Sequence, residues 1–194
     1  MRYDAGHKAR TREMILSEAA RAIRSDGPHN VAVAGLMARV GLTHGGFYAH
    51  FKSRDELLAA AIRHTFQEVA YRLQPATLSE DPAATLKSYI EHYLSRSHRD
   101  APATGCPLPI LSADLPRLTG AARDAFSEGI GHMSARLANT LTALGHEDAP
   151  GLATSMLAEM VGALSLARAV SDPDQSDAIL KASRRALKQR AAVA

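Results

Sequence analysis

Apolar residues recur along this chain at the three- and four-residue spacing of amphipathic helices. Ile15, Ala19 and Ile23 form one such stripe, and charged residues such as Arg12 and Glu18 lie outside it. No stretch shows the alternation of β-branched and polar residues that is typical of strands. The pattern therefore predicts an all-α protein.

Turn and capping residues divide the pattern into separate helices. Asp26-Gly27-Pro28 ends the first one, because glycine tolerates a left-handed cap and proline cannot continue a helix. Ser53-Arg54-Asp55-Glu56 is a capping box, and Asp81-Pro82 and Asp172-Pro173 each place an N-cap oxygen before a proline. The predicted helices cover about residues 8–25, 33–40, 43–49, 53–73, 81–98, 117–144, 148–170 and 173–190, with a broken, partly helical connector over 100–116.

The two short helices on either side of Gly41 are of particular interest. Each is only about two turns long, so neither is stable unless it packs against the other. Their packing residues are Val33, Leu36, Val40, Leu42, Phe47 and Phe51. A tight glycine turn between short helices is typical of a DNA-reading helix-turn-helix, although helical hairpins occur in many folds. Gly45-Gly46 costs roughly 1 kcal/mol per glycine in a helix, which indicates either close approach of the backbone to DNA or a loose first turn.

Charge is distributed unevenly between the two ends of the 194-residue chain. Residues 1–72 hold 11 Lys and Arg against 7 Asp and Glu, whereas residues 73–194 hold 12 against 13. The positive end fits an anionic partner, although a solvated basic face gives the same count. No run of about 18 apolar residues and no secretion signal is present, so we expect a cytoplasmic protein that does not enter a membrane.

Residues 8–63 resemble the N-terminal domain of the TetR/AcrR family of transcription regulators. The resemblance rests on Asp26-Gly27 at the end of the first helix, on the run from Leu36 to Phe51, and on Lys52-Ser53-Arg54-Asp55-Glu56-Leu57-Leu58. It implies a three-helix DNA-binding domain over 8–68, followed by a larger helical domain over 69–194 that binds a small-molecule effector and forms a homodimer. The implied function is that of a ligand-responsive repressor released from its double-stranded DNA operator by the effector.

The family's roles carry over to particular residues of this sequence. Thr43, His44 and Gly45 are expected to face base edges, and Tyr48, His50 and Lys52 to meet the phosphate backbone. For His50, packing inside the domain is the alternative. Arg10 and Thr11 are expected to touch phosphate at the start of the first helix, with Lys8 and Arg2 adding contacts from an N-terminal arm. The sequence departs from the family at Val31-Ala32, where many members carry a capping Thr or Ser, so Asn30 is the expected cap.

The larger domain offers candidates for effector binding and dimerisation. Residues that could line an effector pocket are Phe66, Tyr89, Tyr93, Cys106, Phe126 and Met133, although a plain core explains aromatic and Met residues equally well. Their apolar character fits a hydrophobic or aromatic effector. The last two long helices present apolar stripes that form either the dimer interface or the internal core; these are Met156, Met160, Ala163 and Ala167 on one helix and Ile179, Leu180 and Leu187 on the other.

Cys106 opens an alternative mode of regulation. It lies before a short predicted helix, where a thiol becomes a better nucleophile, and a Gly-Cys at a similar place occurs in a branch of the family that senses oxidants and electrophiles. The alternative function is thus a thiol-based redox- or electrophile-sensing repressor, whereas a buried, inert cysteine is the plainer interpretation. The sequence holds no hydrolase elbow, phosphate loop, Rossmann fingerprint or zinc-protease motif, so we expect neither an enzyme nor a bound metal or cofactor.

Overall fold

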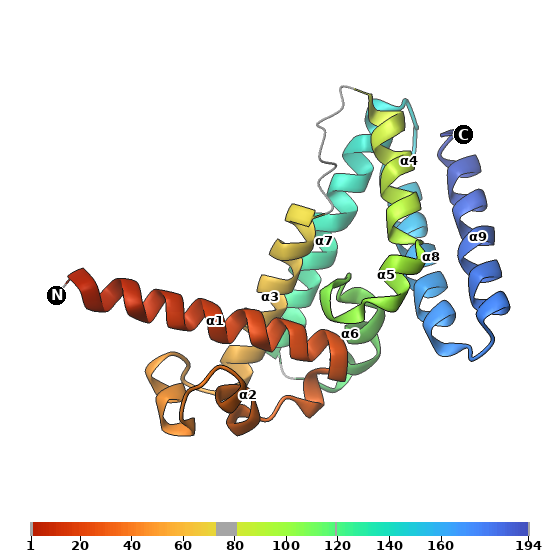
Figure 1. The fold of residues 1–194 in the computed structure, drawn as a ribbon. Coiled ribbons are helices and arrows are strands. Elements are labelled where there is room, and N and C mark those ends of the chain that lie inside the picture. Colours follow the sequence, from red (N-terminus) through yellow and green to blue (C-terminus); the bar gives the residue numbers. More distant parts are fainter. Residues whose placement is uncertain (1, 73–80, 119, 194) are drawn as a thin grey trace. The chain divides into compact units, whose positions relative to one another are not determined.

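The computed structural model describes residues 2–72, 81–118 and 120–193, and within these ranges it contains helices and no strands (Figure 1). The all-α prediction is confirmed. The α-helices are α1 (Arg2–Asp26), α2 (Val33–Arg39), α3 (Arg54–Arg72), α4 (Pro82–Tyr93), α5 (Arg96–Asp100), α6 (Leu108–Asp114), α7 (Gly120–Ala143), α8 (Ala149–Ala169) and α9 (Pro173–Arg190). Short 3-10 helices are η1 (Pro28–Asn30), η2 (His44–Ala49), η3 (Pro102–Thr104) and η4 (Leu115–Arg117).

The helices form two compact units. Unit 1 comprises Met1–Glu68 and Cys106–Gly129, and unit 2 comprises Val69–Gly105 and Ile130–Ala194. The predicted change of domain after residue 68 coincides with one crossing between the units. However, the segment Cys106–Gly129 groups with unit 1, because α6 packs against α1 and η1. The chain therefore crosses between the units within α3, at Gly105–Cys106 and within α7.

Several helix ends follow from the capping residues seen in the sequence. Asp81 Oδ1 accepts the Ala83 amide at 2.9 Å, and Asp172 Oδ1 accepts the Asp174 amide at 3.0 Å. The helix predicted to run to about residue 98 is instead interrupted after Tyr93. Ser95 starts the separate helix α5 there, because its hydroxyl accepts the amide of His98 at 3.1 Å.

Unit 1 is organised around α1 and the first part of α3. Ile15, Ile23 and Ile62 have no exposed surface, which places the apolar stripe of α1 in the core as predicted. Arg24 of α1 and Glu68 of α3 form an ion pair, with Arg24 Nη1 2.7 Å from Glu68 Oε2. The first helix begins at Arg2 rather than near Lys8, so Arg10 and Thr11 lie in its interior and residue 2 is helical rather than part of an extended arm.

The core of unit 2 includes the interface between α8 and α9. Met156, Met160, Leu180 and Leu187 are at most 1% exposed within the single chain. The two apolar stripes thus pack against each other inside the chain, and burial of each large side chain stabilises the unit by about 1.5–3 kcal/mol. Within the single chain, Ala163 and Ala167 of the predicted stripes are also buried, whereas Ile179 is half-buried.

Among the described helices, α8 alone is long and apolar enough by composition to qualify as a membrane span. The core helix of a soluble protein passes the same test. Because one side of α8 is buried against α9, its apolar composition has an explanation within the fold.

His98 in unit 2 gives the folded protein a sensitivity to acid. Its ring is 7% exposed and its Nδ1 lies 2.7 Å from the Tyr93 carbonyl oxygen. Burial lowers the pKa of His98 from 6.5 to about 4, and the positive charge of Arg168 acts in the same direction. The folded protein therefore holds this imidazole neutral at pH values where the unfolded chain binds a proton.

Between pH 6.5 and pH 4, His98 is expected to lower the free energy of unfolding by up to about 3 kcal/mol, because the unfolded chain takes up the proton first. The loss begins as the pH falls below 6.5 and levels off below about 4. Urea denaturation across this range measures it. His98→Asn keeps a donor for the Tyr93 carbonyl and removes the titration, so its pH dependence should be shallower. Equal pH dependence in the two proteins would contradict the assignment.

Candidate nucleic-acid interface

The segment η2 is anchored by aromatic side chains. Phe47 and Phe51 are each 1% exposed, and their rings stack with centroids 5.7 Å apart. Leu36 and Met37 of α2, both without exposed surface, lie in the same core of unit 1, and α2 packs against η2. The short helices therefore stabilise each other, as their length requires.

The turn between α2 and η2 depends on a glycine. Gly41 has a φ of 73°, a left-handed conformation that a side chain disfavours. The Leu42 amide donates to the Met37 carbonyl at 2.9 Å and the Gly41 amide to the Ala38 carbonyl at 3.0 Å. These two bonds form a Schellman motif, which ends α2 sharply and sets the direction in which η2 begins.

Thr43 is the N-cap of η2. Its backbone is extended, and its hydroxyl accepts the Gly46 amide at 3.3 Å. The segment is a six-residue 3-10 helix rather than an α-helix, which is longer than the three or four residues usual for this form. Thr43, His44 and Gly45 are exposed, and Tyr48 is 64% exposed. The apolar side of η2 is thus buried and its polar side faces outward.

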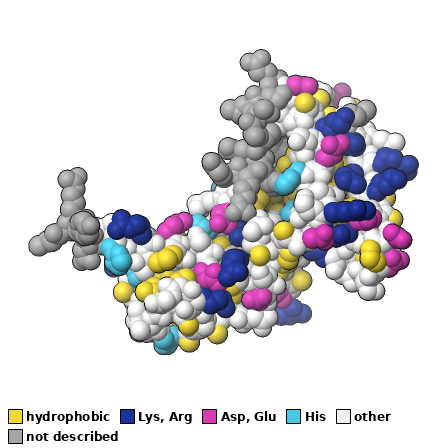
Figure 2. All heavy atoms as spheres, viewed as in Figure 1, with side chains coloured by type: hydrophobic (Ala, Val, Ile, Leu, Met, Phe, Trp, Pro, Cys, Tyr) yellow, Lys and Arg dark blue, Asp and Glu magenta, His cyan; other side chains and the backbone are white. Residues whose placement is uncertain are grey.

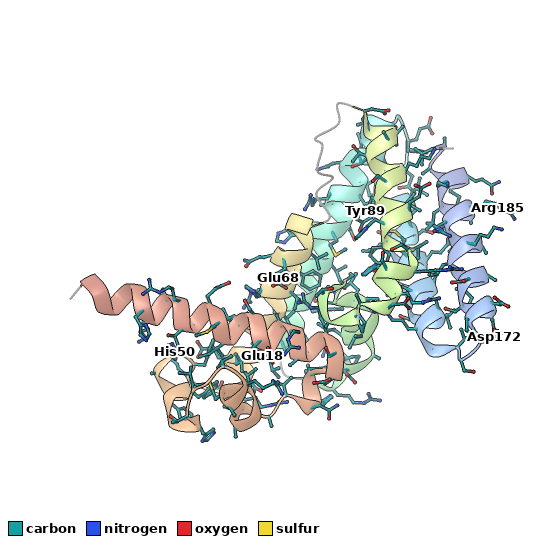
Figure 3. All side chains as sticks on the ribbon, viewed as in Figure 1. Glu18, His50, Glu68, Tyr89, Asp172 and Arg185 are labelled. Atoms are coloured by element: carbon teal, nitrogen blue, oxygen red, sulfur yellow. The ribbon has the colours of Figure 1, made fainter. Side chains whose placement is uncertain are left out.

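A cluster of cationic groups from α1 lies beside this segment at His50, which Figure 3 labels. Burial lowers the pKa of His50, and the nearby Lys8, Arg12 and His7 lower it further. The guanidinium of Arg12 lies over the Phe51 ring, 4.8 Å from its centroid. His50 Nδ1 is buried and has no hydrogen-bond partner among the described residues, so the ring has an unused polar atom within a positive environment.

The predicted DNA-contacting residues are exposed with two exceptions. The exposed ones are Lys8, Arg10, Thr43, His44, Gly45, Tyr48 and Lys52. His50 is half-buried, and Thr11 is only 6% exposed because it faces into unit 1 from the interior of α1. Asn30 is not the cap of α2: its side-chain amide donates to the Asp26 carbonyl at 2.6 Å, and α2 begins after Ala32 with no side-chain cap.

The structure also identifies residues that the sequence pattern did not single out for the site. Arg54, the first residue of α3, donates from Nη2 to the Pro28 carbonyl at 2.6 Å and from Nε to the Val31 carbonyl at 3.2 Å. It thereby ties α3 to the connection between α1 and α2. Its place within the capping box gave no signal of this role. Around that box, the Glu56 amide donates to Ser53 Oγ at 3.1 Å and the Lys52 amide to Glu56 Oε2 at 2.8 Å.

Glu18 forms a second tie within the same unit (Figure 3). Its carboxylate accepts from Arg39 Nε at 2.6 Å and from Arg21 Nε at 3.0 Å. Because Arg39 ends α2 and Glu18 belongs to α1, this contact holds α2 on α1. Together with the hydrogen bonds of Arg54, this contact sets the orientation of the short helices within unit 1.

The residues predicted to line an effector pocket are divided between the two units. In unit 1, Phe66 and Phe126 form an edge-to-face pair with centroids 5.9 Å apart, and Cys106 is 1% exposed. In unit 2, the ring centroids of Tyr89 and Tyr93 are 6.0 Å apart, and Met133 is half-buried. Within the described ranges, no cluster of three or more His, Cys, Asp or Glu side chains could hold a metal ion.

The fold and the exposed segment define a class of protein, the helix-turn-helix transcription regulators with a helical C-terminal domain. Residues 15–61 match the family described as bacterial regulatory proteins, tetR family, and residues 82–183 match the tetracyclin repressor-like C-terminal domain. This chain belongs to the TetR family and is a DNA-binding transcription regulator. No curated protein sequence matches it at a significant level.

Solved structures share the fold over nearly the whole chain. E. coli NemR in its reduced form has a TM-score of 0.81 at 19% identity, covering 92% of this chain and 95% of that one. A TetR regulator from Chloroflexus aurantiacus has a TM-score of 0.80 at 23% identity, covering 97% and 96%. One from Agrobacterium tumefaciens has a TM-score of 0.78 at 23% identity, covering 94% and 98%. At these identities the likeness concerns the fold.

Proposed function

We propose that this protein is a cytoplasmic, homodimeric, non-enzymatic repressor. It dissociates from its DNA operator when it binds a small hydrophobic or aromatic molecule. The observation that carries the proposal is the segment Thr43–Tyr48, whose apolar side is buried, followed by His50, near which Lys8 and Arg12 of α1 lie. Thr43, His44 and Gly45 contact base edges, while Tyr48, His50 and Lys52 contact phosphates together with Lys8 and Arg10. Phosphate contacts position the protein and base contacts specify the sequence.

Gly45 supports a close approach of the backbone to DNA. Its φ is not positive, and a Cβ built at this position meets no atom of the chain within 4 Å. Neither backbone conformation nor internal packing therefore requires glycine here. The open space at residue 45 is compatible with the proposed contact between the backbone and DNA.

Gly45→Ala is expected to fold normally yet bind operator DNA at least tenfold more weakly, because the added methyl group would meet the DNA. Lys52→Ala should weaken binding to all sequences similarly and reduce the salt slope by about 1. Fluorescence anisotropy with DNA from upstream of the protein's own gene, against scrambled DNA at several salt concentrations, measures both. Gly131→Ala is the control, since it adds the same methyl group in open space on α7. Unchanged operator affinity of Gly45→Ala, or salt-independent binding by the wild type, would contradict the proposal.

We assign the dimer interface to the outer faces of α8 and α9 rather than to their buried stripes. On α8 the side away from the core carries Leu166, which is 59% exposed, with Ala158 and Gly162 at helical spacing. Small residues beside one large apolar side chain allow two helices to approach closely. Two recognition segments about one DNA turn apart also require a pair of subunits.

Leu166→Glu is expected to convert the dimer to a monomer, since each subunit would bury an unpaired carboxylate in the interface. Light scattering after gel filtration measures the mass, starting from 20.7 kDa per chain. Ala121→Glu, at an exposed position of α7 in unit 1, provides a comparison outside this face of α8. A wild-type protein that is monomeric at micromolar concentration would overturn the assignment.

Effector binding is proposed to act by shifting a balance between two arrangements of the units. A ligand shifts such a balance only if its affinity for the two arrangements differs. The crossings within α3 and α7, and at Gly105–Cys106, are where a change in unit 2 can reach unit 1. A thermal-shift screen of aromatic and other apolar molecules, followed by competition with bound operator DNA, tests this step.

A second candidate function is a repressor that senses oxidants through Cys106. The thiol lies at one of the crossings between the units, and a neighbour of the same fold, E. coli NemR, is described in a reduced form. Hydrogen peroxide would convert the thiol to a sulfenic acid and release water. Loss of operator binding with peroxide in the wild type but not in Cys106→Ser would favour this function, and equal behaviour would exclude it. Because Cys106 is 1% exposed, the reaction requires local opening.

A further inference from the structure

A polar groove in unit 2 lies between the first residues of α5 and one face of α9. It encloses about 470 Å³. Leu94 and Leu180, at 0% and 1% exposed, belong to its lining, together with the hydroxyls of Ser95 and Ser97. The remaining lining residues are all charged: Arg96, Asp177, Lys181 and Arg184.

The single carboxylate of this lining is already neutralised. Asp177 Oδ1 accepts from Arg96 Nε and from Arg99 Nη1, both at 2.9 Å. The hydrogen bond from Arg96 lowers the pKa of Asp177, which keeps the carboxylate ionised and paired. Arg99 is held in place by a further bond to Ser176 Oγ at 2.8 Å.

Lys181 and Arg184 follow one and two turns later on the same face of α9. Among the residues that the structure describes, neither forms an ion pair, whereas the next cation on this face, Lys188, pairs with Glu91 at 3.1 Å. Arg184 is half-buried and Lys181 is exposed. Lys and Arg side chains also gather over the C-terminal helices in Figure 2. The groove thus carries two cations beyond those that Asp177 neutralises.

We propose that this groove binds a compact anion with two negative charges, either a phosphoryl group or a dicarboxylate. Arg184 and Lys181 would donate charge-assisted hydrogen bonds to it, which are about twice as strong as neutral ones. The planar guanidinium of Arg184 matches the two oxygens of a carboxylate or phosphate, and Lys181 adds a point charge. This site lies within unit 2 and is independent of the DNA contacts of unit 1.

Isothermal titration calorimetry on the full chain at pH 8 tests the site with two probes, inorganic phosphate and succinate. Sodium chloride at equal ionic strength provides the reference. Saturable binding of one probe or both is expected, and the preferred probe distinguishes the phosphoryl from the dicarboxylate source. Arg184→Gln and Lys181→Gln should each weaken binding about tenfold or more.

Arg185→Gln is the matched control, because Arg185 is exposed on α9 outside the groove lining (Figure 3). It removes the same charge from the neighbouring position and should leave the affinity unchanged. Circular dichroism confirms that each variant is folded. Equal weakening by Arg185→Gln and Arg184→Gln would show a general charge effect and overturn the proposal. Absence of saturable binding by both probes would overturn it as well.

Discussion

Phe47→Ala is expected to destabilise unit 1 by about 3–5 kcal/mol and to abolish operator binding. The ring is 1% exposed and stacks on Phe51, so its removal leaves a cavity beneath the segment that we propose enters the DNA groove. Because η2 is only six residues long, it has no stability of its own to offset the loss. Urea denaturation followed by circular dichroism measures the stability, and fluorescence anisotropy measures operator binding.

The adjacent Tyr48→Ala should show the opposite combination. Tyr48 is 64% exposed, and its ring packs edge-on against Phe47 at a centroid distance of 5.2 Å. Its removal should cost about 1 kcal/mol of stability or less, yet weaken operator binding at least tenfold. If the two neighbouring substitutions changed stability by equal amounts, the orientation of η2 described here would be wrong.

Arg54→Ala is expected to lower the free energy of unfolding by about 3 kcal/mol. It should also weaken DNA binding by more than the loss of one positive charge would by itself. Its guanidinium serves the carbonyls of Pro28, His29 and Val31, and charged hydrogen bonds are worth about 1.5–3 kcal/mol each. Removing the guanidinium leaves these carbonyls without this donor and loosens the connection between α1 and α2.

Arg54→Lys separates charge from geometry, since lysine keeps the charge but cannot serve three carbonyls with a planar fork. It should recover less than half of the lost stability. Thermal unfolding and operator affinity are measured side by side, with Lys52→Ala as the charge control two residues earlier. If Arg54→Lys behaved like the wild type in both, Arg54 would act through its charge alone, and the positioning role would be refuted.

Much of the fold was predictable because helices are local. The spacing of Ile15, Ala19 and Ile23 placed one face of α1 in the core, and all three are fully buried. Asp81 and Asp172 marked the starts of α4 and α9 through caps that depend only on neighbouring residues. The interruption after Tyr93 was missed, since a Ser95 cap competes with continuation of the helix and the sequence does not show which prevails.

For the candidate site, the sequence identified the residues of the segment Thr43–Tyr48 but not the residues that hold this segment in place. Thr43 as a cap, the turn at Gly41 and the buried Phe47 all follow from short-range patterns. Arg54 and Glu18 escaped detection, because the partners through which they tie helices together lie 21 or more residues away in the chain. Thr11 was assigned to DNA, yet it faces inward once α1 is extended to Arg2.

The sequence by itself determined the helical class and the capped starts of α4 and α9, because each depends on residues within about one turn. The tertiary structure decided the rest. It placed Cys106–Gly129 in unit 1, turned the stripes of α8 and α9 inward against each other, and left Lys181 and Arg184 without acidic partners in the described groove. Long-range packing decides between alternatives that are locally equivalent, and only the folded chain shows which surfaces remain for DNA and for ligands.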